Sequence, residues 1–209
     1  MKHFSCILIL CFTVSGIPAQ NSIAGQTLYN SNFDIDGIPR SCTFYIPLKY
    51  GKTETLPLII MLHDKNSNVK TLIKNYGDTM HTIADSIGAV IIYPSAVAGT
   101  WHDSSIKNSV NDVGYISILI DYFVQRYQCS AEQVYIAGVG NGAAMAMRFA
   151  CDLPSKVTAI AALLYTGNPT CENLLVPLMS AEKTITSSGK ITNTILSDMW
   201  KFFLEHKKE

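Results

Sequence analysis

A glycine-rich turn holds the residues best placed to do chemistry in this sequence. The segment Val134–Met147 reads VYIAGVGNGAAMAM, with a predicted strand before the turn and a predicted helix of small residues after it. Gly138 and Gly142 have the spacing of the two glycines in G-x-S-x-G, the motif that raises a nucleophilic serine above a sheet on a sharp turn. Its central position is Gly140, which has no side chain to attack a carbonyl. The spacing therefore predicts the turn of a serine hydrolase without the serine.

A second mechanism, dinucleotide binding, fits the same turn less well. Gly138, Gly140 and Ala143 satisfy G-x-G-x-x-A, in which a pyrophosphate binds at the N-terminus of the helix. That use also needs an acidic residue at the end of the next strand, about 20 residues on, to bind the ribose. The next predicted strand ends at Leu164, and no acidic residue follows it before Glu172. Dinucleotide binding is therefore disfavoured, and we predict no cofactor.

The elements that must position this turn alternate between buried strands and amphipathic helices. Continuous apolar runs of the kind buried on both faces predict strands at Leu56–Leu62, Gly88–Tyr93, Val134–Ala137 and Val157–Leu164. Helical spacing predicts helices at Val69–Ile87, Asn111–Tyr127 with Asn111 as cap, Asn141–Cys151 and Ile191–His206. A hairpin of Gln26–Phe33 and Arg40–Ile46, with Asp36-Gly37 as its turn, precedes them. The pattern predicts an α/β fold, with a mainly parallel sheet and helices on both faces, in one domain over residues 20–209.

Several segments resemble, in the right order, blocks of the secreted polyhydroxybutyrate depolymerase and feruloyl esterase-like family of α/β hydrolases. The blocks are RSCTFYIP (Arg40–Pro47), LPLIIMLHD (Leu56–Asp64), IIYPSAVAGTWHD (Ile91–Asp103), NDVGYISILIDYFVQRY (Asn111–Tyr127), the segment Val134–Leu164 and the closing MWKFFLEHKK (Met199–Lys208). The resemblance implies a three-layer α/β-hydrolase sandwich and a serine carboxylic-ester hydrolase. In that mechanism a serine attacks the ester carbonyl, a histidine takes its proton and a carboxylate orients the histidine. Backbone N–H groups stabilise the oxyanion.

The resemblance also assigns positions in the site. Gly140 takes the place of the nucleophile, the N–H of Asn141 is implied as one oxyanion donor, and the loop after His63 is implied to supply the other. The His-Gly that precedes this loop in the family is His63-Asp64 here, and residues 63–68 contain no glycine. Because glycine permits close approach of a backbone, we expect this loop, with Asp64 in the oxyanion region, to lose the family's close approach.

The acid and the histidine of the mechanism have no counterpart after the turn. The only aspartates there are Asp152 and Asp198, and the only histidine is His206. Asp198 and His206 are separated by about 12 Å along a predicted helix, which prevents their pairing. Loss of a complete triad lowers kcat by a factor on the order of 10⁶. We therefore predict a pseudoenzyme, a protein that keeps the hydrolase fold without its acyl-transfer chemistry.

Two alternatives to a pseudoenzyme are a residual ester hydrolase and a decayed gene product. A residual ester hydrolase with another nucleophile would use a serine of the loop after the second buried strand: Ser95, Ser104 or Ser105. These serines are also typical of ordinary loop and turn positions. A decayed gene product would have no selected function.

A third alternative is a non-enzymatic protein that binds an ester or a saccharide. The candidate binding residues are His63 and, in the loop after the second buried strand, Trp101 and His102. Aromatic side chains commonly line such pockets. The same pair also fits a packed aromatic residue beside a solvated histidine, so both interpretations remain open.

The N-terminal residues are typical of a cleaved secretory signal. Lys2 and His3 precede the apolar run Phe4–Val14, which is too short to span a bilayer comfortably, and Ala19 follows among small residues. We predict a signal peptide over residues 1–19 and a secreted or periplasmic protein without a membrane span. Sixteen basic residues balance sixteen acidic ones, so no net field favours nucleic acid or an anionic membrane.

Four cysteines lie beyond the predicted signal, which in an exported protein indicates disulfides. Cys151 and Cys171 bracket one predicted strand and its loops, and we predict a disulfide between them. Cys42 and Cys129 have no assigned partner. The spacings contain no C-x-x-C pair, so a zinc site is disfavoured and no metal is predicted.

Overall fold

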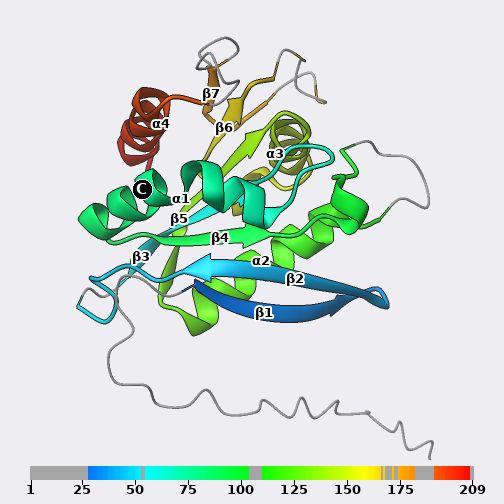
Figure 1. Ribbon diagram of the computed structural model, residues 1–209, viewed down its shortest axis with the longest axis horizontal. Helices are drawn as coiled ribbons and strands as arrows, with labels where there is room; N and C mark the ends of the chain where they lie inside the picture. Colours follow the sequence, from blue (N-terminus) through cyan, green and yellow to red (C-terminus); the bar gives the residue numbers. More distant parts are fainter. Residues whose placement is uncertain are drawn as a thin grey trace, which may run out of the picture.

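A seven-stranded sheet forms the centre of the part of the chain that the structure describes (Figure 1). The structure is a computed structural model that describes residues 28–52, 55–103, 110–165, 167, 171, 174–181 and 191–207. The predicted signal peptide, together with Ser104 and Ser105, lies outside these residues. The strands are β1 (Leu28–Ile35), β2 (Ile38–Tyr45), β3 (Leu56–Leu62), β4 (Val90–Pro94), β5 (Cys129–Val139), β6 (Ala159–Leu163) and β7 (Leu178–Ala181).

The sheet is mainly parallel, with an antiparallel hairpin at one edge. Its strand order is β1-β2-β4-β3-β5-β6-β7. The strands from β4 to β7 pair in parallel, whereas β1 pairs antiparallel with β2 and β2 antiparallel with β4. The predicted turn at Asp36-Gly37 closes the hairpin, with φ of 55° and 76° at the two residues. Two positive φ values are what a two-residue hairpin turn requires, and Asp and Gly tolerate them.

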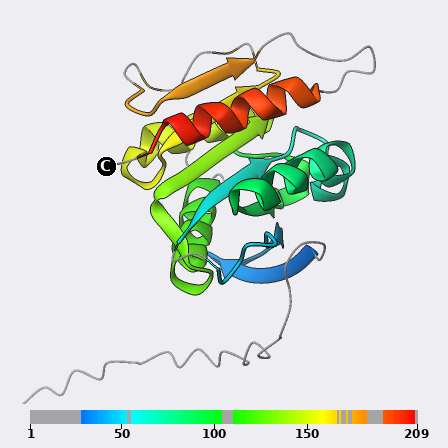
Figure 2. The ribbon, with the colours of Figure 1, turned by 90° about the vertical axis from the view of Figure 1, so that its left-hand side faces the viewer.

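Helices cover both faces of this sheet. They are α1 (Val69–Ile87), α2 (Asp112–Arg126), α3 (Asn141–Asp152) and α4 (Asn193–Glu205), with short 3₁₀ turns η1 (Val97–Gly99) and η2 (Pro154–Lys156). One hydrophobic cluster joins α2 and α3 to one face, and a second joins α1 and α4 to the other. Figure 2 shows α1 and α4 lying on the same side of the sheet. The predicted three-layer α/β architecture with an N-terminal hairpin is confirmed.

Local signals set the ends of two helices. Asn68 caps α1 by accepting a hydrogen bond from the N–H of Thr71 at 3.0 Å, and Gly88 ends that helix with φ 81°. Asn111 caps α2, as predicted, by accepting from the N–H of Gly114 at 2.8 Å. A short polar side chain at each start satisfies N–H groups that have no partner within the helix.

The bounds of most predicted strands differ from the observed ones by one or two residues, and two strands differ by more. β5 begins at Cys129 rather than Val134, because Leu56 of β3 pairs with Cys129 across a register shift. This added segment includes exposed Glu132, so it lacks the continuous apolar character that predicts a buried strand. β7 has no predicted counterpart. It is a four-residue edge strand whose residues are half-buried or exposed, which gives it no periodic pattern to detect.

Of the four cysteines beyond the predicted signal, two form a disulfide and two are buried thiols. The predicted disulfide between Cys151 and Cys171 is present and ties the end of α3 to the segment that follows β6. Cys42 and Cys129 are free and buried. Burial raises the pKa of the Cys42 thiol to about 12 and raises that of Cys129 as well, so both remain protonated. No helix within the described ranges combines the length and apolar character needed to cross a membrane.

Candidate active site

The glycine-rich turn lies where β5 passes into α3, at the carboxyl edge of the sheet (Figure 1). Gly140 has φ 52° and ψ −113°, a conformation that residues with a Cβ adopt only under strain. Its N–H donates to the carbonyl oxygen of Leu163 at 2.9 Å, which fixes the turn to the neighbouring strand. The turn therefore has the sharp, strained form that a nucleophile elbow requires.

Two further glycines let the backbones at this edge approach one another. A Cβ at Gly138 would lie 2.1 Å from the carbonyl oxygen of Gly142, and a Cβ at Gly142 would lie 2.5 Å from that of Leu62. Leu62 also pairs with Gly138 in the parallel register of β3 and β5. The loop after β3 and the turn after β5 therefore leave the sheet side by side.

Two backbone donors converge on one oxygen between this loop and this turn. The N–H of Lys65 donates to Oδ1 of Asp64 at 2.7 Å, and the N–H of Asn141 donates to the same oxygen at 2.9 Å. Donors at these distances, one from the elbow and one from the loop after β3, have the arrangement of an oxyanion hole. Lys65 gave no signal in the sequence, because its backbone N–H, rather than its side chain, makes the contact.

The loop after β3 lies close to the turn although residues 63–68 contain no glycine. Asn66 supplies the left-handed residue that the loop needs, with φ 56°, and its N–H donates to the carbonyl oxygen of Gly99 at 3.0 Å. Asparagine tolerates this region better than most side chains. The glycines that permit the approach lie instead in the turn, at Gly138 and Gly142.

The carboxylate of Asp64 fills the space in which a serine side chain would begin. A Cβ built on Gly140 would lie 2.1 Å from Oδ1 of Asp64 and 2.5 Å from its Cγ. Asp64 is itself exposed, so the carboxylate covers the elbow from the solvent side. A side chain at position 140 would have to displace this carboxylate and break the two hydrogen bonds that hold it.

His63 lies beneath the loop and has both ring nitrogens engaged. Its Nε2 accepts from the N–H of Ala96 at 3.2 Å, so its proton is on Nδ1, which donates to the carbonyl oxygen of Asp64 at 2.8 Å. The residue is only 1% exposed, and this burial lowers the pKa of His63. The expectation that His63 contacts a ligand is therefore corrected: it is a neutral support for the loop.

Trp101 also supports the site rather than lining a pocket. It is 1% exposed, and its Nε1 donates to the carbonyl oxygen of His63 at 2.9 Å. The backbone N–H of Trp101 donates to Oδ1 of Asn141 at 2.8 Å, and Nδ2 of Asn141 donates back to the carbonyl oxygen of Trp101 at 3.2 Å. Trp101 contacts the loop after β3 through its indole and the start of α3 through its backbone, so it does not form the predicted ligand wall.

His102 is held by a buried ion pair. Its backbone N–H and its Nδ1 lie 2.8 Å and 3.1 Å from Oδ2 of Asp112, whose Oδ1 is 2.6 Å from Nη2 of Arg40. Asp112 and Arg40 have side chains 0% and 2% exposed, whereas the side chain of His102 is 33% exposed. Of the three predicted ligand contacts, His102 is therefore the one with appreciable surface. The Arg40–Asp112 pair joins residues 72 positions apart, which spacing does not reveal.

The histidine and the aspartate near the C-terminus do not reach the elbow. The carbonyl oxygen of His206 accepts from the hydroxyl of Tyr135 at 2.9 Å, which places His206 beside the middle of β5 rather than at the end that carries Gly140. Asp198 is exposed on α4. The described residues contain no group of three or more His, Cys, Asp or Glu side chains that could hold a metal ion.

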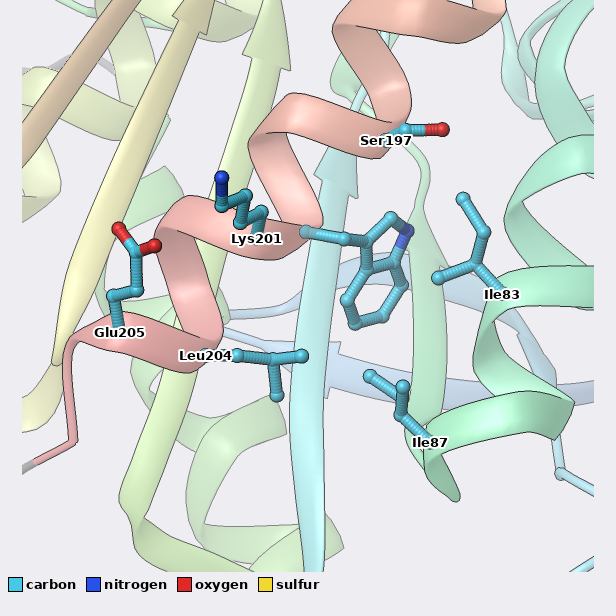
Figure 3. Close-up of a pocket in the computed structure, with 7 residues that line it drawn as sticks. Ile83, Ile87, Ser197, Lys201, Leu204 and Glu205 are labelled. Atoms are coloured by element: carbon cyan, nitrogen blue, oxygen red, sulfur yellow. The ribbon is translucent and has the colours of Figure 1, made fainter.

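A groove between α1 and α4 lies on the outer surface of those helices rather than at the elbow (Figure 3). Ile83 and Ile87 of α1 face Leu204 of α4, with Lys201 and Glu205 also on its α4 side. The groove has a volume of about 360 Å³ and a mainly apolar lining. Ser197 also lines the groove, but its hydroxyl donates to the carbonyl oxygen of Asn193 at 3.0 Å rather than to a base, so the elbow remains the candidate active site.

Comparison with known proteins identifies the family. Residues 40–172, more than half of the chain, match the family model described as esterase PHB depolymerase. The chain is 25% identical over 176 residues to poly(3-hydroxybutyrate) depolymerase of Ralstonia pickettii, and these cover 75% of this chain and 35% of that protein. It is also 25% identical over 182 residues to acetylxylan esterase A of Emericella nidulans, with 81% of this chain and 56% of the relative covered. The chain thus spans about a third to just over a half of these relatives.

A solved structure supports the same assignment at the level of the fold. The crystal structure of a thermostable esterase superimposes with a TM-score of 0.67 at 11% identity, covering 87% of this chain and 63% of that one. The elbow between β5 and α3 and the two backbone donors beside it lie within the matched residues 40–172. This chain belongs to the esterase PHB depolymerase family of α/β hydrolases.

Proposed function

We propose that this chain is an exported member of the family that does not hydrolyse esters. One observation carries the proposal: the elbow residue is Gly140, and the carboxylate of Asp64 lies where the nucleophile's side chain would start. Acyl transfer by this fold needs a side-chain nucleophile at that point. Neither the glycine nor a carboxylate held by two N–H groups supplies the hydroxyl that such a mechanism uses.

The described histidines near the elbow and after α4 also do not supply the base that the mechanism needs. His63 uses both ring nitrogens in contacts with the backbone, and His206 lies beside the middle of β5. Loss of a triad costs on the order of 10⁶ in kcat, and what remains comes largely from the oxyanion hole and from binding. Here both oxyanion donors are already bonded to Asp64. We therefore expect no measurable turnover rather than a reduced one.

A different nucleophile finds no support among the described loop serines. The hydroxyl of Ser95 lies 3.3 Å from that of Ser41 in a partly buried contact. A hydroxyl without a base beside it is a weak nucleophile. Ser104 and Ser105 lie outside the described residues.

Export is part of the proposal. A signal-like N-terminus precedes the domain, and the disulfide between Cys151 and Cys171 is of the kind that persists in oxidising compartments. We propose a secreted or periplasmic location on these two observations. Detection of the processed chain outside the cytoplasm, with residues 1–19 removed, would support it.

Binding without cleavage is the second candidate function. His102 has a partly exposed side chain in the loop beside the elbow, and the relative from Emericella nidulans is named an acetylxylan esterase. An ester or saccharide is therefore the ligand class that we propose for this surface. Saturable binding of an acetylated xylo-oligosaccharide, weakened by His102→Ala, would support it, and unchanged binding in that variant would remove His102 from the site.

The experiment that tests the main proposal combines covalent labelling with turnover. The purified chain is treated with a fluorophosphonate probe and assayed with short-chain and feruloyl esters, with Gly140→Ser and Gly140→Ala as a matched pair. We expect no labelling and no turnover in the natural chain, and none in Gly140→Ser, because a restored hydroxyl still has no base. Labelling or turnover of the natural chain would overturn the proposal.

A further inference from the structure

We propose that Asp64 is an intramolecular ligand of the oxyanion hole, an autoinhibitory contact that closes this site to a carbonyl oxygen. The proposal rests on the proposed function. It adds that the carboxylate of Asp64 is the group that closes the site, and that this carboxylate and Gly140 depend on each other. Asp64 approaches from the loop after β3, and Asn141 begins α3, 77 residues further along the chain.

The contact uses the same donors that a substrate would need. The N–H groups of Lys65 and Asn141 bind one carboxylate oxygen, Oδ1, at 2.7 Å and 2.9 Å. An ionised acceptor forms a hydrogen bond roughly twice as strong as a neutral one. A group tethered next to its site also has an effective concentration of about millimolar or above. An ester carbonyl, which is neutral and untethered, therefore competes poorly for these donors.

The start of α3 further favours the carboxylate. Gly140, the N-cap residue of this 12-residue helix, has no side chain to cap it. Asp64 takes this role from another part of the chain by accepting from the N–H of Asn141. A negative charge near a helix N-terminus is stabilised by the helix dipole. A helix cap alone would explain stability, whereas an autoinhibitory contact must also exclude an added anion, and this difference makes the proposal testable.

Asp64 and Gly140 depend on each other. A Cβ at position 140 would lie 2.1 Å from Oδ1 of Asp64, so any side chain there must expel the carboxylate from the donors. Conversely, removal of the carboxylate leaves the donors open beside a glycine. The two positions therefore form a coupled pair, because the carboxylate of Asp64 can occupy the donors only while position 140 carries no side chain.

The test measures whether a small anion reaches the two N–H groups. The ¹⁵N-labelled chain is titrated with sodium acetate against sodium chloride at equal ionic strength, and the backbone resonances of Lys65 and Asn141 are followed. We expect saturable shifts at both residues in Asp64→Ala, with an affinity roughly tenfold or more above that of the natural chain. Asp64→Asn, which keeps an oxygen at this position, is expected to remain closed.

A matched control removes a neighbouring side chain without touching the donors. Lys65→Ala keeps its own backbone N–H and leaves Asp64 in place, so it is expected to behave like the natural chain. Acetate shifts of the same size in the natural chain and in Asp64→Ala would overturn the proposal, as would their absence from both residues in a folded Asp64→Ala. These outcomes are independent of whether any form of the chain hydrolyses an ester.

A second measurement needs no variant and applies even if Asp64→Ala does not fold. The N–H groups of Lys65 and Asn141 in the natural chain are expected to exchange with D₂O more slowly than the same two N–H groups in the urea-unfolded chain. A third measurement uses variants and reads the coupling from melting temperatures: Gly140→Ala should lower the melting temperature less in an Asp64→Gly background than in the natural one. Exchange of both N–H groups at the rate of exposed backbone, or equal losses in the two backgrounds, would refute the contact.

Discussion

The elbow and the C-terminal helix are both ordered by packing, and they differ in which groups that packing brings to the edge of the sheet. At the elbow the backbone keeps its strained turn and two converging donors, and only side chains differ from those that catalysis needs. In the C-terminal region, α4 packs Phe203 fully into the core, but the histidine that follows it, His206, lies beside the middle of β5 rather than at the elbow. In both regions the contacts that fold the chain are present where the catalytic groups are not.

The difference follows from what packing requires. The donors of the oxyanion hole are main-chain groups, which almost any residue supplies once the backbone is in place. The strained turn is required by the close approach of Gly138 and Gly142 to their neighbours, not by the side chain at position 140. A catalytic side chain adds nothing to this packing, so its loss leaves the backbone of the site intact.

The largest expected effects on the free energy of unfolding test whether both regions contribute to the stability of the fold. At the C-terminus, Phe203→Ala should lower the free energy of unfolding by about 3–5 kcal/mol, because it empties a fully buried aromatic site. Phe202→Ala, at the half-buried neighbouring position, is the control and should cost clearly less. Urea unfolding measures both. Equal losses in the two variants would mean that α4 does not pack as described.

Beneath the elbow, Asp112→Ala should be comparably destabilising. It leaves the Arg40 guanidinium, 2% exposed, without its partner, and breaking a buried pair from one side costs about 3–5 kcal/mol. The exposed pair of Lys156 and Asp121 offers the control, because Asp121→Ala should cost only about 0–1 kcal/mol. Chemical denaturation distinguishes the two. A loss below about 1 kcal/mol for Asp112→Ala would contradict a structural role for this pair.

A smaller effect is expected at the elbow itself. Gly140→Ser should lower stability by about 1–3 kcal/mol, since it places a Cβ at positive φ and against the carboxylate of Asp64. Asp64→Gly combined with Gly140→Ser should recover part of this loss. Differential scanning calorimetry of the three proteins measures it. A clear rise in the melting temperature of Gly140→Ser would show that position 140 does not favour glycine.

The comparison also separates what the sequence predicts from what it does not. The continuous run Leu56–Leu62 and the helical spacing of Val69–Ile87 each predict an element whose bounds the structure reproduces. The glycine spacing predicts the turn at Gly140. These features are local, because a strand, a helix or a turn is encoded by neighbouring residues.

The parts that could not be predicted depend on contacts between distant residues. Asp64 was recognised as a departure from the family's glycine, but nothing in the spacing shows that its carboxylate reaches Asn141. The residue types of Trp101 and His63 also fit ligand contacts, and only their burial and the hydrogen bond between them show that they support the loop. Short edge strand β7 has too little pattern to detect. Side-chain contacts at this edge of the sheet join the loop after β3, the loop after β4 and the start of α3. The pattern of residues within any one of these segments does not reveal such contacts.

The smallest expected effect concerns pH and the neutral state of His63. Its pKa is lowered by burial below its ordinary value of 6.5, so the unfolded chain takes up this proton first as pH falls. The stability that His63 contributes is therefore present above about pH 6.5 and decreases as pH falls toward the folded-state pKa. His81, whose pKa burial also lowers, contributes in the same direction. Urea unfolding of the natural chain, His63→Asn and His81→Asn between pH 5.5 and 7.5 should show a shallower dependence in each variant. If the dependence of unfolding free energy on pH is the same in His63→Asn as in the natural chain, His63 is not buried in the neutral form. The loop that carries Asp64 would then have to be supported by groups other than His63.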